Sequence, residues 1–423
     1  MLRRLLPLAL ATFAVGTDGF VIAGLLPSIG ADLGVSTAAA GQLVTVFALT
    51  MALSAPLMGA LTSGLDRRSA LLIALGVFVA GNAATALGTR YETVLAARIV
   101  TAVGAGVISS AASGTAAALA PPERRGRALA FVLGGLTSAT ALGLPLGTLI
   151  GRADWHVTLW AVAGTGLLAA VGIALGLPRV SLPAASLADR LRPLARGRVL
   201  AQLAVTSLAF LGTYTVYTYI APVVRDVTGG TTGLLTLVLL AWGLGTLAGN
   251  IAAGRLADRF APHRVLTGAL GLGVLTLALT PLATRTLTTA LIWAALWGLG
   301  GGAVLVPQQH RLVALGPATA PILLGLNSSA LYVGVALGGG LGGLLQTRGG
   351  PEPAVLGPVA AGVTTVALLW HLYAARRGAV RPDDPAPTPG PGPEPGPTPG
   401  PGPTPGPGPA PEPIPSGPAR TKV

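Results

Sequence analysis

The sequence of 423 residues contains no cysteine and little charge. Without cysteine, the chain cannot form disulfides, thiolate metal sites or a cysteine nucleophile. Charged residues make up 10% of the chain, whereas an ordinary soluble domain has about 25%. Hydrophobic residues make up 52%, and the mean hydropathy is +0.71. This balance predicts a polytopic membrane protein.

Histidine is also scarce, and no two histidines stand at the spacing of metal ligands. The four are His156, His263, His310 and His371. The chain lacks the patterns of an ATPase cassette, a nucleophile triad or paired catalytic carboxylates, and no Lys-Ser/Thr follows its glycine-rich segments. We therefore expect neither an enzyme, nor a metal site, nor a cofactor.

The formal net charge of +13 comes from arginines that stand in short clusters between apolar runs. No basic face is interleaved with aromatic residues, so we expect no nucleic-acid partner. The arrangement is instead typical of loops that flank membrane spans.

Twelve apolar runs, bounded by glycine, proline and charged clusters, are each long enough to cross the hydrocarbon core of a bilayer, which is about 30 Å thick. The predicted spans lie near 5–29, 39–62, 70–88, 93–120, 128–150, 155–177, 200–222, 232–254, 265–282, 287–309, 319–345 and 354–374. The sequence therefore predicts an all-α membrane protein with twelve transmembrane helices.

The arginines also predict the orientation of these spans. With the N-terminus in the cytoplasm, nineteen arginines fall in inner segments and only five in outer loops, namely Arg90, Arg152, Arg225, Arg285 and Arg348. Positive residues collect on the cytoplasmic side of a membrane. We therefore expect a multi-pass protein of the plasma membrane with both termini in the cytoplasm.

The longest inner connection, residues 178–199, is basic and separates two sets of six spans. We expect an N-terminal bundle over 1–177, a C-terminal bundle over 200–375 and a cytoplasmic tail over 376–423. The Pro/Gly repeat at 382–418 cannot build a core, so the tail should be disordered. It could serve as a ligand for a proline-binding domain, or it could be a dispensable repeat.

Two predicted cytoplasmic turns correspond between the halves. They are "GALTSGLDRRSALL" at 59–72 and "GRLADRFAPHRVL" at 254–266. Each has a glycine at a helix end, a short turn with an acid and arginines, and then another apolar helix. This correspondence indicates an internal repeat of six spans.

The second turn resembles the signature cytoplasmic turn of the major facilitator superfamily. Span one ("GTDGFVIAGLLPSIGADLGVS"), span two ("AGQLVTVFALTMALSAP"), span four ("AARIVTAVGAG") and the entry to span five ("PPERRGRALAFVLGGLTSATALGLPLGT") are similar to the twelve-span drug:proton antiporters. Within these, the sequence is similar to the arabinose-efflux-permease-like and chloramphenicol-resistance-like exporters. The resemblance covers about residues 1–375 and implies two pseudo-symmetric six-helix bundles.

The resemblance also assigns cytoplasmic gate residues. In the second turn these are Gly254, Asp258, Arg259 and Arg264; in the first they are Gly59, Asp66, Arg67 and Arg68. The first turn departs from the family pattern, with Ser63 where aspartate is usual and Asp66 where glycine is usual. The latch must then rely on Asp66 with its two arginines, or on the intact second turn.

The antiporter signature of span five is altered as well. The sequence keeps Gly143, Pro145 and Gly147 but lacks the usual Gly-Pro pair. Antiport is therefore implied by similarity alone.

Asp18 and Arg98 are the clear pair of opposite charges deep within the spans. Counting about 1.5 Å per helical residue, both lie about 20 Å from the cytoplasmic surface. A charge at that depth costs about 2.5–3.5 kcal/mol on insertion scales, so it usually has a partner or a task. The pair could be a structural ion pair or a proton-exchanging site. In the resembled family, the arginine that matches Arg98 is implicated in proton coupling.

Polar and aromatic residues in other spans are candidates for a substrate cavity. Span seven holds three of the six tyrosines, Tyr214, Tyr217 and Tyr219, of which the first two share a helical face. Such rings suit flat, moderately apolar substrates or cations, although an interfacial aromatic belt fits equally and suits Tyr219 better. Further candidates are Gln308, Asn327 and Tyr332, although a buried amide is more often a link between helices.

The leading hypothesis is a secondary transporter that exports a small organic molecule, a drug-like compound or a metabolite, in exchange for protons. A sugar or nucleoside facilitator or importer on the same fold is the first alternative. A non-transporting scaffold that uses the tail is the second, but it would have no use for two charges in the membrane. The expected partners are the substrate, protons and the lipid bilayer, and a bundle of this size can work as a monomer.

Overall fold

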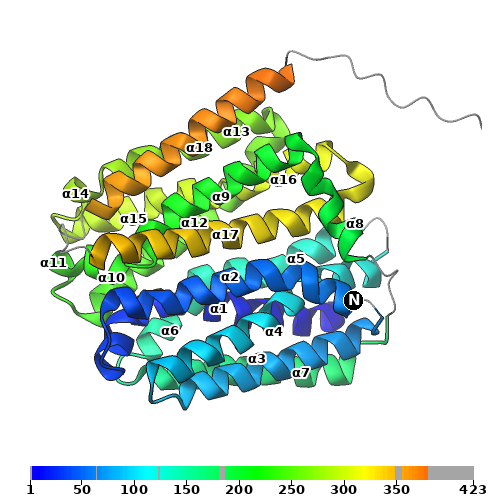
Figure 1. The fold of residues 1–423 in the computed structure, drawn as a ribbon, viewed down its shortest axis with the longest axis horizontal. Helices are drawn as coiled ribbons and strands as arrows, with labels where there is room; N and C mark the ends of the chain where they lie inside the picture. The colour runs from blue at the N-terminus through cyan, green and yellow to red at the C-terminus, as the bar shows by residue number, and fades with distance from the viewer. Residues whose placement is uncertain (1, 63, 122–123, 181–185, 348–354, 380–423) are drawn as a thin grey trace, which may run out of the picture. The chain divides into compact units, whose positions relative to one another are not determined.

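The computed structural model describes residues 2–62, 64–121, 124–180, 186–347 and 355–379, and within these ranges the regular structure is helical, with no strand (Figure 1). A helix bonds its own backbone N–H and C=O groups, which a bilayer interior requires. Ser63 and the repeat at 382–418, on which two sequence expectations fall, lie outside the described residues.

The first half consists of α1 (Leu2–Asp32), α2 (Thr37–Leu61), α3 (Arg67–Ala86), α4 (Tyr91–Leu119), α5 (Arg125–Ser138), the π-helix η2 (Ala139–Gly143), α6 (Leu144–Ile150) and α7 (Trp155–Gly176). A connection with α8 (Leu187–Leu191) and the 3-10 helix η3 (Arg192–Ala195) follows. The second half consists of α9 (Gly197–Tyr217), α10 (Ile220–Val223), α11 (Arg225–Thr228), α12 (Thr232–Arg259), α13 (Pro262–Ala278), α14 (Thr280–Ala283), α15 (Leu287–Gly302), α16 (Leu305–Ala314), the 3-10 helix η4 (Pro317–Thr319), α17 (Ala320–Thr347) and α18 (Leu356–Ala379).

Eleven helical segments of the described chain are long and apolar enough to cross a membrane. The remaining predicted span, 265–282, is divided into α13 and α14. Pro281 has no N–H to bond the carbonyl of Leu277, which instead accepts a hydrogen bond from Thr280 Oγ1 at 2.8 Å. The neighbouring carbonyl of Thr276 accepts a bond from Trp293 Nε1, also at 2.8 Å. Side chains thus satisfy the carbonyls where the helix is interrupted.

The fifth predicted span is one helical path, α5–η2–α6, with a π-helical turn just before Pro145. Leu144 N bonds Ala139 O, five residues back, and this wider turn accommodates the proline, which cannot donate. Gly143 and Gly147 face α1: a Cβ on Gly143 would collide with Thr17 Oγ1, and one on Gly147 would lie 2.6 Å from Val21 Cγ2. The altered antiporter motif therefore allows the fifth span to pack closely on α1.

The buried apolar residues form four clusters, and their composition differs between the ends of the bundle. We call the end at which α1 begins the proximal end and the end at which α1 finishes the distal end. The distal cluster combines both halves, joining residues such as Leu26 and Leu43 to Val223 and Leu239. Toward the proximal end, the buried members of one cluster come from the first half alone, and those of two others come from the second half alone. The halves therefore share a core at the distal end and have separate cores at the proximal end.

Across the two halves, α17 packs against α2, and α12 packs against η2 and α6. Glycines make these approaches close: Gly339 faces Thr45 of α2, and Gly243 faces the backbone of Thr140. At the proximal end, the connecting segment also touches the first half, since Arg190 Nη2 donates to Gly59 O at 3.0 Å. Small residues are the usual means of close helix contact in membranes.

We predict that Gly338→Ala destabilises the protein, whereas Gly340→Ala, two residues away on α17, does not. A Cβ at Gly338 would lie 2.6 Å from Leu211 O and 3.0 Å from Thr215 N, while one at Gly340 would meet no atom within 4 Å. Overpacking costs about 1–3 kcal/mol, and a free Gly→Ala change in a helix gains up to about 1 kcal/mol. Melting temperatures in detergent test this contrast; equal shifts for the two variants would contradict it.

Candidate functional site

Asp18 of α1 and Arg98 of α4 form a fully buried ion pair. Arg98 Nη1 lies 2.6 Å from Asp18 Oδ1, both side chains are 0% exposed, and Arg98 Nη2 lies 3.5 Å from the carbonyl oxygen of Asp18. The two residues expected at the same depth are thus brought together. Each charge compensates the other, which lowers the cost of placing either in the interior.

The aromatic ring of Phe47 on α2 forms a second contact of this pair. The guanidinium carbon of Arg98 lies 4.1 Å from the ring centroid, within the range of a cation–π interaction. Arg98 therefore sits between a carboxylate and an aromatic face, and the carboxylate alone can lose its charge.

The pair retains unused hydrogen-bonding capacity. Asp18 Oδ2 and Arg98 Nε are buried without a hydrogen-bond partner of ordinary geometry. The side chain of the fully buried Asn82 on α3 lies close enough to the Asp18 carboxyl to interact with it, and Asn82 Oδ1 has no hydrogen-bond partner. Asn82 Nδ2 donates to the carbonyl of Phe78 at 3.2 Å. Oδ1 of Asp18 bonds Arg98, whereas Oδ2 does not.

An aromatic cluster lies where α1 of the first half meets the second half. It consists of Phe20, Tyr214, Tyr217, Trp242, Trp293 and Trp297. The centroid of Tyr217 is 4.4 Å from that of Trp242, 5.1 Å from that of Tyr214 and 6.3 Å from that of Phe20, with the last pair edge to face. Three of the six tryptophans of the chain belong to this cluster, although aromatic residues make up only 4% of the sequence.

The cluster is tied to the ion pair through α1. Tyr217 Oη donates to the carbonyl of Phe20 at 3.1 Å, and Phe20 follows Asp18 by two residues. Trp297 Nε1 is buried and has no hydrogen-bond partner, so it is a free donor among apolar rings. A flat ligand could stack on such rings and be oriented by this donor.

The other cavity candidates are two amides that bond α9, and Tyr332, which packs against the core that contains this aromatic cluster. Asn327 Oδ1 accepts from Thr206 Oγ1 at 2.7 Å, and Gln308 Nε2 donates to Gln202 O at 2.5 Å. Both amides therefore link α9 to a neighbouring helix, which was the alternative open for them. Tyr332 is half-buried and packs against apolar clusters of both ends.

Tyr219 does not belong to an interfacial belt. Its side chain is fully buried, and its hydroxyl donates to Gly339 O at 3.0 Å. The distal ends of the two halves pack around this ring, because Gly41 of α2 also faces it. Sequence position near a helix end therefore suggested an exposed setting that tertiary packing removes.

The acid of the first of the two turns, Asp66, caps a helix. Asp66 accepts hydrogen bonds from Ser69 N at 3.1 Å and Ser69 Oγ at 2.6 Å, at the N-terminus of α3. These bonds hold the pKa of the Asp66 carboxyl below its usual range. Arg68 Nη2 donates to Ala174 O at 2.5 Å, and Arg67 N donates to Val180 O at 2.8 Å. These contacts stay within the first half and the connection that follows it.

The charged residues of the second turn are exposed and form no ion pair with the part of the first half that the structure describes. Asp258, Arg259 and Arg264 are exposed, and none of them forms an ion pair with another described residue. Arg264 stands at an apolar cavity of about 340 Å³ between α12, α13 and α15. A latching role for this turn would need a state in which the proximal ends come together.

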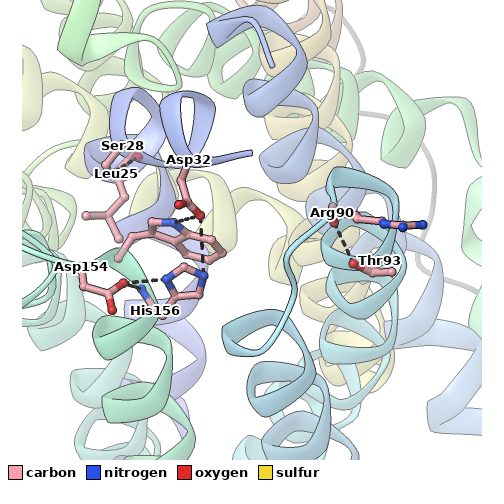
Figure 2. Close-up of polar contacts among 8 residues, drawn as sticks. Leu25, Ser28, Asp32, Arg90, Thr93, Asp154 and His156 are labelled. Atoms are coloured by element: carbon pink, nitrogen blue, oxygen red, sulfur yellow. Dashed lines mark hydrogen bonds and ion pairs between the residues drawn. The ribbon is translucent and has the colours of Figure 1, made fainter. Parts of the chain in front are cut away.

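A separate polar cluster links α1 to α7 at the distal end (Figure 2). Asp32 Oδ2 accepts from Trp155 Nε1 at 3.1 Å and lies 3.7 Å from His156 Nε2. His156 Nδ1 lies 2.6 Å from Asp154 Oδ1, and this contact lowers the pKa of the Asp154 carboxyl. His156 thus stands between two carboxylates. In the described chain, no group of three or more His, Asp or Glu side chains is arranged to hold a metal.

Sequence analysis missed Phe47, Asn82, Trp242, Trp293 and Trp297. The tryptophans carried a usable signal, because Trp293 and Trp297 are one helical turn apart in a chain with few aromatic residues. Phe47 and Asn82 carried none, since their roles depend on which helices surround α1.

Comparison of the sequence with known proteins identifies its family. The family model described as Major Facilitator Superfamily matches residues 8–314 and again residues 203–416. The inner membrane transport protein YdhP of Escherichia coli K12 is 33% identical over 377 residues, covering 88% of this chain and 96% of its own. A chloramphenicol resistance protein of Streptomyces lividans is 39% identical over 265 residues, covering 61% of this chain and 67% of its own.

Among solved structures, the crystal structure of a D-xylose-proton symporter has a similar fold. Its TM-score is 0.71 at 19% sequence identity, and the match covers 88% of this chain and 97% of the symporter chain. At that identity the likeness concerns the fold alone.

We predict that Phe47 and Asp18 are energetically coupled through Arg98. In Asp18→Asn, the guanidinium loses its counter-charge, and the Phe47 ring becomes its main remaining partner, worth about 0.5–2 kcal/mol. Phe47→Leu should therefore lower the melting temperature more in the Asp18→Asn background than in the wild type, which a double-mutant cycle measures.

Phe78→Leu is the matched control, because Phe78 is equally buried but contacts no charged side chain among the ring contacts described. Its effect should be the same in both backgrounds. Additivity of Phe47→Leu with Asp18→Asn would show that the ring does not stabilise the cation.

Proposed function

We propose that this chain, which belongs to the major facilitator superfamily, exports a small, flat, largely apolar organic molecule across the cytoplasmic membrane in exchange for protons. It is a multi-pass membrane transport protein and not an enzyme. The observation that carries the proposal is the fully buried Asp18–Arg98 pair, two residues along α1 from an aromatic cluster built by both halves.

Proton exchange requires a group with two states of similar free energy in the membrane interior. Asp18 can be a carboxylate bonded to Arg98 or a neutral acid, in which case Arg98 keeps the Phe47 face and the Asp18 carbonyl. The unbonded Oδ2 is the atom that would take the proton. Protonation would weaken the contact between α1 and α4, because the neutral acid no longer attracts the guanidinium.

The change at Asp18 can reach the substrate through α1. The same helix carries the Phe20 carbonyl that accepts from Tyr217, so a shift of α1 alters the contact between the two halves at the aromatic cluster. A substrate stacked in this cluster would in turn favour one position of α1. Each ligand then changes the affinity for the other, as exchange transport requires.

The cluster favours a flat, apolar substrate over a sugar. Its surface is built from aromatic rings, and Trp297 Nε1 is the buried side-chain donor there that lacks a partner. A sugar carries many hydroxyls, which would lose hydrogen bonds to water in such a site. The similarity to a chloramphenicol resistance protein supports a drug-like substrate, so a sugar or nucleoside importer is the second candidate.

We assign the proximal end to the cytoplasm, following the arginine distribution. With a shared core at the distal end and separate cores at the proximal end, the described state would then be open toward the cytoplasm. Export would follow when the two halves rock about the substrate. Closing of the proximal end is the step in which the turn of Gly254, Asp258, Arg259 and Arg264 would act.

We predict that Asp18→Asn abolishes substrate-induced proton release from the purified protein. The amide keeps the shape of the side chain but cannot titrate. The measurement follows the pH of a weakly buffered solution on addition of a substrate found in a growth-inhibition panel, with chloramphenicol tested first. Asp18→Glu restores a carboxylate and should retain part of the release.

Glu92→Gln removes an exposed carboxylate from the same half and serves as the control, with unchanged release expected. Undiminished proton release from well-folded Asp18→Asn protein would exclude Asp18 as the coupling group. A structural ion pair predicts a different pattern, in which Asp18→Asn mainly lowers stability and simultaneous removal of Arg98 restores it.

We also predict that Trp297→Phe weakens substrate binding about fivefold while leaving expression unchanged. The variant keeps an aromatic ring but removes the free N–H, and a hydrogen bond contributes about 1 kcal/mol. Quenching of tryptophan fluorescence by the substrate measures the affinity. Trp160→Phe, at a 45% exposed position on α7, is the matched control; an equal loss in both variants would argue against a substrate site at the cluster.

A further inference from the structure

A cavity of about 450 Å³ lies at the distal end, between the two halves. The first half contributes Ser28 at the end of α1, Thr37 at the start of α2 and Arg152 from the turn before α7. The second half contributes Arg225 of α11, Thr228, and Thr232 at the start of α12. The cavity is separate from the aromatic cluster and from the Asp18–Arg98 pair, none of whose residues line it.

The charges around this cavity are unbalanced. Arg152 and Arg225 are exposed, and neither guanidinium forms a hydrogen bond or an ion pair with the residues that the structure describes. Among the residues that the structure describes, no aspartate or glutamate lines the cavity. The acids nearest along the chain to the two arginines do not line the cavity: Asp226 follows Arg225, and Asp154, two residues after Arg152, lies 2.6 Å from His156 Nδ1 (Figure 2). Asp32, near the end of α1, accepts a hydrogen bond from Trp155 and does not line the cavity either.

The position of the two arginines is unusual for a membrane protein. Only five arginines fall in the segments predicted to be outside, yet two of them, one from each half, face the same cavity. Like charges that meet when the distal ends close repel one another. A bound anion would convert this repulsion into an attraction between the halves.

Hydrogen-bond donors in the cavity match the same ligand. The hydroxyls of Thr37 and Thr232 make no hydrogen bond with described residues, whereas that of Ser28 donates to Leu25 O at 2.8 Å. The cavity also borders the N-terminus of the 28-residue helix α12, whose N-cap residue Thr231 provides no side-chain cap. Free N–H groups and the helix dipole favour negative charge at that point.

We propose that this cavity binds an anion bearing a phosphate or carboxylate group, which bridges Arg152 and Arg225 and stabilises the state in which the distal end is closed. Arginine is suited to both groups because its fork of donors bonds two oxygens at once. By binding one state more tightly than the other, the anion shifts the equilibrium between them. Its source is a solute in the outer aqueous phase or the headgroup of an anionic lipid.

The first test measures binding by thermal stabilisation of the full chain in an uncharged detergent, with inorganic phosphate as the probe at constant ionic strength. Phosphate should raise the melting temperature of the wild type, less so that of Arg152→Gln or Arg225→Gln, and not that of the double variant. Arg285→Gln is the matched control, an exposed arginine on the same side that does not line the cavity, and it should respond like the wild type. Equal shifts in the double variant and the wild type, or no shift at all, would overturn the proposal.

A second test follows the conformation. The chain has no cysteine, so spin labels can be attached selectively to Thr93→Cys on α4 and Thr288→Cys on α15, both exposed at the distal end. Phosphate should increase the population of the shorter distance between the labels, and the Arg152→Gln/Arg225→Gln background should remove the effect. A distance distribution that phosphate leaves unchanged in the wild-type background would contradict the bridging role.

The source of the anion is distinguished in nanodiscs without phosphate. Discs of phosphatidylglycerol should shift the distance distribution relative to phosphatidylcholine discs if a lipid headgroup occupies the cavity, and the two arginine substitutions should abolish that shift. If the anion is a solute, the two lipids give the same distribution until phosphate is added. Neither outcome depends on the direction of transport or on Asp18.

Discussion

The need to place a carboxylate in the interior of a membrane shapes the site region of this protein. Asp18 is tolerated because α4 brings Arg98 to within 2.6 Å of it, and because Phe47 of α2 covers the other side of the guanidinium. Three helices of the first half are therefore held in register around one polar pair. The two charges neutralise each other, but not every polar atom of the pair is hydrogen-bonded: Asp18 Oδ2 and Arg98 Nε have no partner of ordinary geometry. In the proposed mechanism, the contact between α1 and α4 is stable while Asp18 is a carboxylate and weakens when Asp18 is protonated.

The helix that carries this carboxylate also contacts the opposite half. Two residues beyond Asp18, the Phe20 carbonyl accepts from Tyr217, and from there a continuous set of rings extends to Trp242 and Trp297. The described residues thus connect the charged pair to the interface between the halves over one turn of α1. This short connection is the physical basis for the proposed coupling of a proton to a substrate, and the proposed binding surface lies where the halves meet.

Movement of the halves depends on a different property, the small residues at their contacts. Glycines of α17 and α12 allow these helices to approach α2 and the fifth span closely. At the distal end, charge acts against close contact. Arg152 of the first half and Arg225 of the second half line the same cavity, and their like charges repel. Under the proposed mechanism, close packing and charge repulsion would together set how readily that end opens.

Much of this protein could be predicted from its sequence. Hydropathy identified the spans and the all-helical fold because each span must satisfy its own backbone in lipid, and the depth of Asp18 and Arg98 followed from the helical rise. The interruption within 265–282 was not predicted, because it depends on side chains such as Trp293 that bond the carbonyls there. The resemblance pointed to the altered motif of span five, whereas its contacts with Thr17 and Val21 were visible only in the packed structure.

Tertiary structure alone decided which residues share a site. Phe47 and Asn82 come from helices that only the packed bundle places beside α1, and the three tryptophans join Tyr217 from two further helices. The structure also showed that the cavity candidates Asn327 and Gln308 bond α9, and that the gate candidate Asp66 caps α3. A sequence specifies how deep a side chain lies along its own helix, but the direction in which it points and the partner it meets depend on the rotation and packing of every neighbouring helix.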